Sequence, residues 1–97
     1  MAKGYWIAHV DVTDPELYKE YQRLNAIAFA KFGAKFVVRG GASESHAAHL
    51  RSRHVIIEFD SFATAKACYH SPEYQAAIVV REKAAKVDAV IVEGYVA

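Results

Sequence analysis

Cysteine, long apolar runs and clusters of like charge are all scarce in this chain, and each shortage excludes a class of protein. A single cysteine, Cys68, cannot form a disulfide within the chain, which favours a reducing compartment. No apolar stretch approaches the roughly 20 residues needed to span a bilayer, and the first residues lack the apolar segment of a signal peptide. We therefore expect a cytoplasmic protein with no membrane partner.

An excess of charge of one sign is also lacking. The sequence holds 12 Lys+Arg against 11 Asp+Glu and contains no basic run, so the electrostatic footprint of a nucleic-acid-binding protein is missing. It has no phosphate-binding loop and no GxGxxG, HExxH or GxSxG motif. No nucleic-acid partner and no cofactor are predicted.

Three histidines near the middle of the chain raise the question of a metal site. The spacing of His46, His49 and His54 is not a recognised ligand pattern. Arg51 and Arg53 lie among them, and their positive charge opposes a divalent cation. The sequence therefore predicts no metal centre.

Apolar and aromatic residues, in contrast, are abundant. At 97 residues the chain is long enough for one domain, 1–97, and too short for two. Hydrophobic residues make up 54% of it and include 6 Tyr, 5 Phe and 1 Trp, which is more than the thin core of so small a domain needs. Burial against a second copy is the simplest use of this surplus, and a homodimer is predicted.

Apolar periodicity and turn residues divide the chain into strands and helices. Short runs rich in β-branched and aromatic residues predict strands, and apolar residues at helical spacing predict helices. The expected order is strand 5–12, helix 15–32, strand 34–39, a polar connection 42–52, strand 53–59, helix 62–70, a second helical piece from 72 to about 86, and strand 88–95.

Capping residues mark the starts of the predicted helices. Thr13 stands three residues before Glu16, which is the spacing of a capping box. Asp60-Ser61 offers a cap for the next helix. Ser71 and Pro72 restart the helix after a break, because serine caps well and proline suits the first position.

This element order predicts an α+β fold, the split βαβ sandwich of βαββαβ order. Interlocked βαβ units place one four-stranded antiparallel sheet against two helices on one of its faces, with the first strand between the third and the fourth. The other face is bare in a monomer, and a bare apolar face favours a partner.

Alternation along the strands sorts the side chains onto two faces. A purely apolar set is assigned to the helix side: Trp6, Ala8, Val10, Val12, Phe36, Val38, Val55, Ile57, Phe59, Val90, Val92 and Val96. The opposite set mixes aliphatic with ionisable residues: Ile7, Val37, Ile56 and Ile91 with His9, Arg39, Glu58 and Glu93. Such a mixed face fits a dimer interface or a closed cavity between two sheets. A register slip of one residue would swap the two faces.

Several short motifs resemble a known family. They are Gly4-Tyr5-Trp6-Ile7, Asp14-Pro15, the pair Tyr18 and Tyr21, the run from Phe36 to Gly41, the run from Val55 to Phe59, Cys68-Tyr69, Ser71-Pro72-Glu73-Tyr74-Gln75, Arg81 and Glu93-Gly94-Tyr95. Together they resemble domain-of-unknown-function family 1330 over essentially the whole chain. The resemblance implies a dimeric α+β barrel of ferredoxin-like topology, in agreement with the element order, and implies no reaction.

The ionisable residues of the mixed face are the first candidates for chemistry. In the predicted sheet order His9 would lie near Glu58 and Glu93, and Glu58 would lie beside Arg39. A histidine held by a carboxylate can act as a general base, and an arginine can anchor a carboxylate substrate. An ion-pair cluster that satisfies itself at the dimer interface is the alternative.

The second helical segment supplies another candidate. Arg81 lies on a stripe with Tyr74, Ile78 and Ala85, from which it can reach an anion or extend to solvent. Cys68 is interpreted as a small buried hydrophobic residue rather than a nucleophile.

Two functions of different classes stay open. In the first, the protein binds a small organic acid or aromatic, or converts it by acid/base chemistry, in a pocket between the sheet and the second helix. His9 and Glu58 would then be catalytic, and Arg39, Arg81 and Tyr74 would bind the ligand. In the second, the protein is a non-catalytic dimerisation or ligand-sensing module whose polar groups fix the pairing geometry.

Overall fold

The computed structural model describes residues 2–47 and 49–97, and its elements follow the predicted order. They are β1 (Gly4–Val12), α1 (Pro15–Phe32), β2 (Lys35–Arg39), β3 (Arg53–Phe59), α2 (Phe62–Tyr69), α3 (Pro72–Ala84) and β4 (Ala85–Glu93). The predicted α+β fold is confirmed, including the break in the second helix at Ser71-Pro72. Within these described ranges, no helix is long and apolar enough to cross a membrane.

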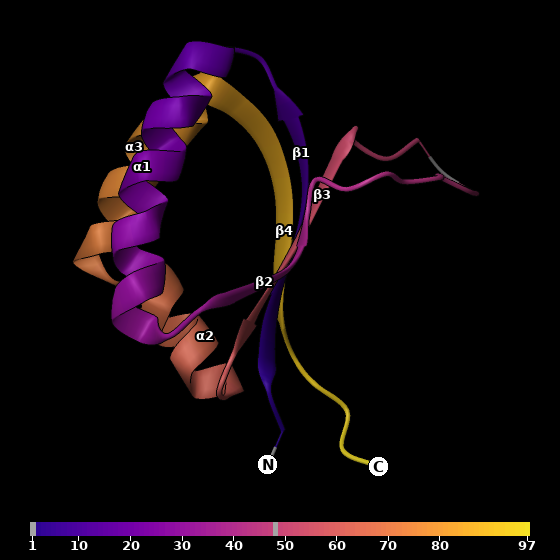
Figure 1. The fold of residues 1–97 in the computed structure, drawn as a ribbon, viewed down its shortest axis with the longest axis vertical. Helices are drawn as coiled ribbons and strands as arrows, with labels where there is room; N and C mark the ends of the chain where they lie inside the picture. The colour runs from indigo at the N-terminus through magenta and orange to yellow at the C-terminus, as the bar shows by residue number, and fades with distance from the viewer. Residues whose placement is uncertain (1, 48) are drawn as a thin grey trace.

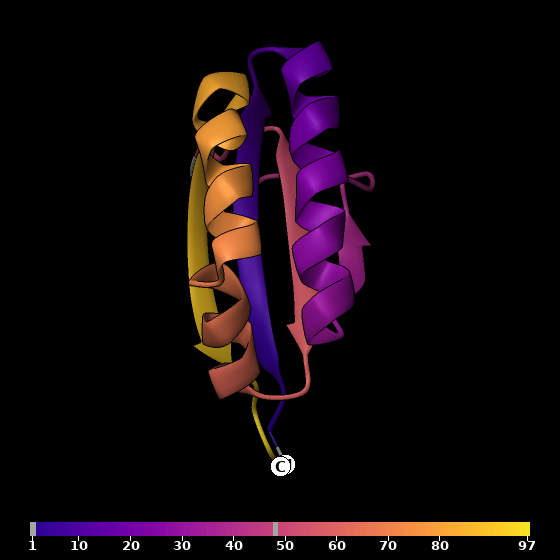
Figure 2. The ribbon, with the colours of Figure 1, turned by 90° about the vertical axis from the view of Figure 1, so that its left-hand side faces the viewer.

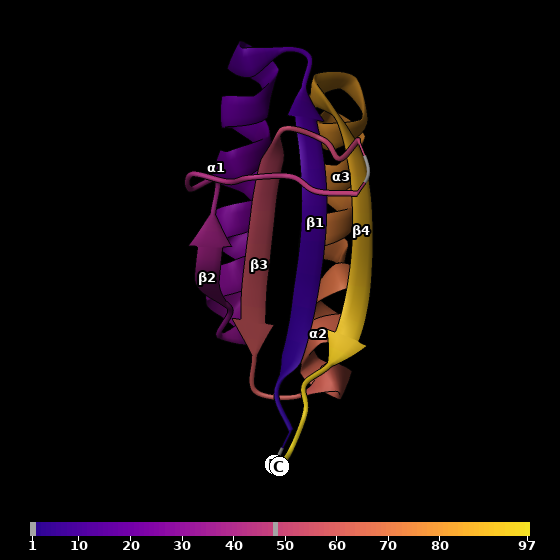
Figure 3. The same ribbon diagram turned by 90° about the vertical axis from the view of Figure 1, so that its right-hand side faces the viewer.

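The four strands form one antiparallel sheet in the order β2-β3-β1-β4, so β1 lies between β3 and β4 as predicted. Helices α1 and α3 run side by side along one face of this sheet (Figure 1 and Figure 2). The opposite face carries no helix in the described part of the chain (Figure 3). We call these the helix-covered face and the open face.

Trp6 lies at the centre of the core between the sheet and the helices. Its ring centroid lies 5.3 Å from that of Phe29 on α1 and 4.7 Å from that of Tyr74 on α3. Its indole N–H donates a hydrogen bond of 2.8 Å to the carbonyl of Ala65 on α2. One side chain of β1 therefore contacts all three helices, and it fixes the distance at which they pack on the sheet.

The predicted core face is confirmed for β1 and β3. The side chains that alternate along these strands toward the helices are buried: Trp6, Val10, Val55, Ile57 and Phe59. Val12, at the end of β1, is more exposed than predicted, with 37% of its surface accessible.

The N-cap of α1 differs from the capping-box prediction. Asp14, and not Thr13, caps the helix, because its Oδ1 accepts a hydrogen bond of 3.1 Å from the backbone N–H of Leu17. The backbone N–H of Thr13 donates instead to the carbonyl of Ala84 at 2.8 Å. This bond ties the turn after β1 to the end of α3.

The predicted caps of the two later helices are confirmed. The hydroxyls of Ser61 and Ser71 accept hydrogen bonds from the backbone N–H groups of Thr64 and Tyr74. Ser71 also donates to the carbonyl of Cys68 at 2.7 Å. A single serine therefore links the end of α2 to the start of α3.

The predicted bounds and faces of β4 were wrong. The strand begins at Ala85, directly after α3, and pairs Ile91 with Trp6 and Val90 with Ile7. Ile91 therefore lies on the helix-covered face, while Val90 and Val92 lie on the open face and are 53% and 39% exposed. Both alternating sets of this strand mix aliphatic with charged residues, Glu93 in one and Lys86 with Asp88 in the other, so alternation alone did not distinguish its two faces.

A bulge in β2 overturns the predicted face of Arg39. The register shifts between Phe36 and Val38, which leaves Val38 opposite Ile56 and Arg39 opposite the core residue Val55. One extra residue in a strand re-aims every side chain that follows it. Arg39 consequently lies on the helix-covered face, not on the open face.

The connection between β2 and β3 crosses the open face toward β4 (Figure 3). Its return is anchored by Arg51, whose guanidinium donates to Asp11 on β1 at 3.0 Å and to Asp88 on β4 at 2.9 Å. The backbone N–H of Ser52 donates to the same Asp11 at 3.0 Å. This hydrogen bond is the main cause that lowers the pKa of Asp11.

Candidate functional site

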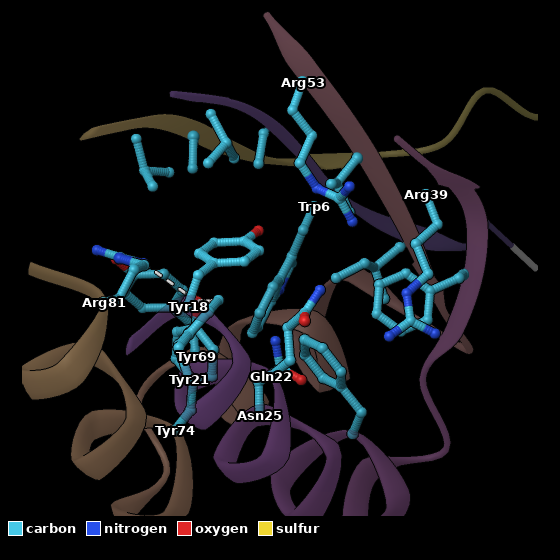
Figure 4. A pocket seen from close by; sticks show the side chains of 18 of the residues that line it. Trp6, Tyr18, Tyr21, Gln22, Asn25, Arg39, Arg53, Tyr69, Tyr74 and Arg81 are labelled. Carbon is cyan, nitrogen blue, oxygen red and sulfur yellow. Dashed lines mark hydrogen bonds between the residues drawn. The ribbon is translucent and has the colours of Figure 1, made fainter. Parts of the chain in front are cut away.

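A cavity of about 50 Å³ lies between the helix-covered face and helices α1 and α3. Trp6 stands in its middle, with Arg81 on one side and Arg39 on the other (Figure 4). An apolar cavity of about 150 Å³ holds a benzene ring. A ligand of that size would therefore occupy this cavity together with its open mouth.

Aromatic and aliphatic side chains form most of the cavity wall. The sheet contributes residues that also belong to the core, and α1 contributes residues from Tyr18 to Phe29. The apolar side chains of the lining that lie on the helix-covered face and α1 are Trp6, Ala8, Val10, Phe29, Phe36, Val55, Ile57, Val87, Ala89 and Ile91. A flat or aliphatic body is the kind of ligand that such a wall stabilises.

Two tyrosines and an arginine form a hydrogen-bonded chain along the helix wall of the cavity. The hydroxyl oxygens of Tyr21 on α1 and Tyr74 on α3 are 2.7 Å apart, and both side chains are buried. Nη1 of Arg81 donates to the Tyr74 hydroxyl at 3.1 Å. The chain links α1 to α3 and holds the Arg81 guanidinium at the cavity.

Burial sets the protonation state of these tyrosines. It raises the pKa of Tyr74 far above its ordinary value, and the charge and hydrogen bond of Tyr21 raise it further. Burial also raises the pKa of Tyr21. Both hydroxyls therefore stay protonated at neutral pH, where they donate hydrogen bonds and do not act as bases.

Three arginines, Arg39, Arg53 and Arg81, line the cavity, and no aspartate or glutamate lines it. Among the described residues none of the three makes an ion pair. Each guanidinium lies near an aromatic ring instead: Arg39 is 4.3 Å from the centroid of Phe36, Arg53 is 5.7 Å from that of Tyr18, and Arg81 is 6.0 Å from that of Tyr74. The cavity thus carries positive charge that no carboxylate in its lining offsets.

The Arg53 guanidinium also has an unused donor. Its Nε is buried and has no hydrogen-bond partner in the described structure. A buried donor without a partner costs about 1–3 kcal/mol. An acceptor that enters the cavity can recover part of that cost.

The predicted ligand-binding residues Arg39, Arg81 and Tyr74 all line this cavity. Arg39 reaches it for a reason that the sequence did not reveal, namely the β2 bulge. Arg81 and Tyr74 reach it through the helical stripe from which they were identified. Their role in binding stays a prediction.

The predicted contact between His9 and Glu58 is wrong. His9 pairs across the sheet with His54, and the Nδ1 atoms of the two rings are 2.8 Å apart. Glu58 pairs with Tyr5 and accepts a hydrogen bond of 3.2 Å from its hydroxyl. Glu58 lies four residues after His54 along β3, which is about 13 Å of extended chain. Both predicted catalytic residues lie on the open face, outside the cavity.

The other contacts of that predicted cluster are also absent in the described structure. Glu93 pairs with Gly4, five residues from His9 along β1. Arg39 lies on the opposite face from Glu58. Strand order alone does not place Glu58 and Glu93 beside His9, because register decides which residues face each other. The bulge in β2 turns Arg39 away from Glu58.

His9 lies instead in a second, more polar hollow on the open face. This hollow of about 380 Å³ is lined by His9, Asp11, His49, Leu50, Arg51 and Asp88. Arg51 donates hydrogen bonds to the carboxylates of both Asp11 and Asp88. No cluster of three or more metal-ligating side chains occurs among the described residues.

Two cavity residues were missed as ligand candidates by the sequence interpretation. Arg53 was considered only as a charge that opposes a metal, yet it lies two residues before Val55 and therefore shares its face. An arginine in an otherwise apolar alternating set was the available signal. Tyr21 was noted as part of a family motif, and nothing in the sequence pairs it with Tyr74.

Residues 3–95 match the model of a family described as a domain of unknown function, DUF1330. The resemblance inferred from the sequence motifs is thereby confirmed. No curated protein matches the chain.

Solved structures share the fold at low sequence identity. A protein of unknown function from Rhodopseudomonas palustris is 18% identical with a TM-score of 0.74, over 99% of this chain and 85% of that one. A dimeric ferredoxin-like protein of unknown function from Thermobifida fusca is 19% identical with a TM-score of 0.61, over 98% and 92% of the two chains. SnoaB, a cofactor-independent oxygenase from Streptomyces nogalater, is 9% identical with a TM-score of 0.65, over 100% and 97%. These likenesses confirm the ferredoxin-like fold and do not extend to a reaction.

Proposed function

This chain belongs to the DUF1330 family, and from that premise we propose that it binds a small organic anion with an aromatic or aliphatic body, without a cofactor, in the cavity between sheet and helices. The observation that carries the proposal is the set of three arginines in a mostly apolar lining that contains no carboxylate. An apolar wall accepts the body of such a ligand, and a guanidinium binds its carboxylate through two parallel hydrogen bonds.

The chemistry of the cavity supports binding over acid/base conversion. Tyr21 and Tyr74 are protonated at neutral pH because burial raises their pKa. His9 and Glu58, the predicted acid/base pair, lie on the open face. The cavity therefore offers hydrogen-bond donors and positive charge to a bound anion, and it offers no general base of ordinary pKa.

Ligand-induced thermal stabilisation tests this proposal. We expect benzoate and phenylacetate to raise the Tm of the protein, by about 4 °C or more once binding adds about 1 kcal/mol. Benzamide has nearly the shape of benzoate but no charge, and it should raise the Tm much less. Measurements at constant ionic strength separate binding in the cavity from a general salt effect.

Two variants locate the binding. Replacing Arg81→Gln should weaken benzoate binding about tenfold, because a hydrogen bond to a charged group contributes about 1.5–3 kcal/mol. Arg23→Gln is the matched control, since Arg23 is exposed on α1, pairs with Glu20 and does not line the cavity. Equal stabilisation by benzamide and benzoate, or unchanged binding in Arg81→Gln, would contradict the proposal.

A homodimer formed through the open faces is the second part of the proposal. Aliphatic side chains lie on the open face of the sheet beside polar ones, and Val90 is 53% exposed there. The Thermobifida fusca protein with the same fold is described as dimeric.

The alternative of a non-catalytic ligand sensor uses the same cavity and the same dimer. A reducing compartment such as the cytoplasm is proposed from the single buried cysteine.

A further inference from the structure

The three cavity arginines fall into two groups on different walls. Arg39 and Arg53 come from the neighbouring strands β2 and β3, and both lie on the helix-covered face. Arg81 comes from the last turn of α3 and is held by Tyr74 on the helix wall. In Figure 4 the rings of Trp6 and Tyr18 lie between Arg81 and Arg39.

Sheet register gives the scale of the separation. Arg53 is paired with Val10, and Val10 is paired with Val87 on β4, so two strand spacings separate Arg53 from Val87. Two spacings amount to about 10 Å between backbones. Arg81 belongs to the β4 side, because its carbonyl accepts the backbone N–H of Ala85 where α3 passes into β4.

Charge balance across this distance favours two anionic groups over one. A single carboxylate at either wall leaves the other guanidinium group without a counter-charge in a mostly apolar cavity. The buried Nε of Arg53 lacks an acceptor, and Arg81 has donors beyond the one that the Tyr74 hydroxyl accepts. Each wall therefore offers guanidinium donors to an acceptor, and the buried Nε of Arg53 lacks one.

We propose that the ligand is a dianion whose two acidic groups are separated by a flat apolar body, one group bound by Arg81 and the other by Arg53 with Arg39. The inference rests on the proposed function, because it assigns a substrate class to the same cavity. The body of the ligand lies against Trp6 and Tyr18. An aromatic dicarboxylate is the simplest member of this class.

Three probes test the inference: terephthalate, its monoamide and benzoate. The monoamide keeps the shape of terephthalate and replaces one carboxylate by a neutral amide. Titration calorimetry at constant ionic strength should give a Kd for terephthalate about tenfold lower than for the monoamide, since charged hydrogen bonds are roughly twice as strong as neutral ones. Arg53→Gln and Arg81→Gln should each reduce this ratio to below about twofold, because each removes one binding group. Arg23→Gln should keep the wild-type ratio.

The outcomes separate this inference from the proposed function. Equal Kd values for terephthalate and the monoamide, with benzoate bound, overturn the dianion and leave the anion cavity in place. A ratio that persists in both Arg53→Gln and Arg81→Gln overturns the assignment of the two binding groups. Absence of binding for all three probes overturns both proposals. The ratio measured on the wild-type protein tests the dianion on its own, even where a variant fails to fold.

Discussion

Cys68 illustrates how burial controls reactivity at a single residue. Its side chain is fully buried, and its Sγ lies 3.9 Å from the carbonyl of Ala28 on α1. Burial raises the pKa of the Cys68 thiol to about 12, with a smaller contribution from the charge of Glu73. The thiolate is the reactive form, so the folded protein holds this cysteine in an unreactive state at neutral pH.

Alkylation rates measure that effect directly. We expect iodoacetamide to label the native protein very slowly at neutral pH and to label the guanidinium-unfolded protein at the rate of a free thiol, which has a pKa of about 8.5. Because Cys68 is the only cysteine, mass spectrometry of the intact chain reports on this single site. Native and unfolded protein labelled at the same rate would refute the burial argument.

The candidate site could be predicted only in part from single residues. Arg81 and Tyr74 were found because charge and ring lie seven residues apart on one helical stripe, and helical spacing is reliable within one element. Arg39 lines the cavity for a reason other than the predicted one, since the β2 bulge turned it toward the helix-covered face. The His9–Glu58 pair failed because a contact between strands depends on register, which the sequence of either strand alone leaves open.

Helix α1 offers a test at the scale of one element. The sequence predicts Thr13 as the cap, whereas the structure assigns this role to Asp14. Loss of an N-cap side chain costs about 1 kcal/mol. Asp14→Ala should therefore lower the free energy of unfolding by about that amount, and Thr13→Ala should change it by only a few tenths because its backbone bond to Ala84 is retained.

Urea unfolding of the two variants gives this comparison. Both substitutions replace a polar residue by alanine at adjacent positions of the same turn, so each is the control for the other. A larger loss in Thr13→Ala than in Asp14→Ala would support the capping box and contradict the structural assignment.

Most elements could be predicted from the sequence because local chemistry specifies their ends. The starts of α2 and α3 follow from Ser61 and Ser71, and the break between these helices follows from Pro72. β4 was placed three residues too late because α3 passes into it at Ala85 with no glycine or proline between them. Where no residue with special backbone or capping properties marks a boundary, only pairing with β1 sets it.

At the scale of the whole molecule, one layer of helices covers one face of the sheet, and no helix covers the other face in the described part of the chain. Register places Ile7 opposite both Ile56 and Val90, so an aliphatic row crosses three strands on the open face. His9 and His54 lie next to this row on the same face. A surface of this mixed kind suits an interface whose polar pairs set the orientation of two copies.

A charge placed in the aliphatic row tests the proposed dimer. Ile7→Glu introduces a carboxylate that a paired open face would bury without a partner, and a buried unpaired charge is strongly destabilising. In a lone subunit the same carboxylate is partly exposed to solvent, so the variant should fold and elute as a monomer in gel filtration with light scattering, whereas we expect the wild type to elute as a dimer. Val79→Glu is the matched control, because Val79 is 60% exposed on α3, away from the open face. The Val79→Glu variant should stay dimeric. If wild type and Ile7→Glu have the same mass, whether as monomers or as dimers, the open face is not the pairing surface.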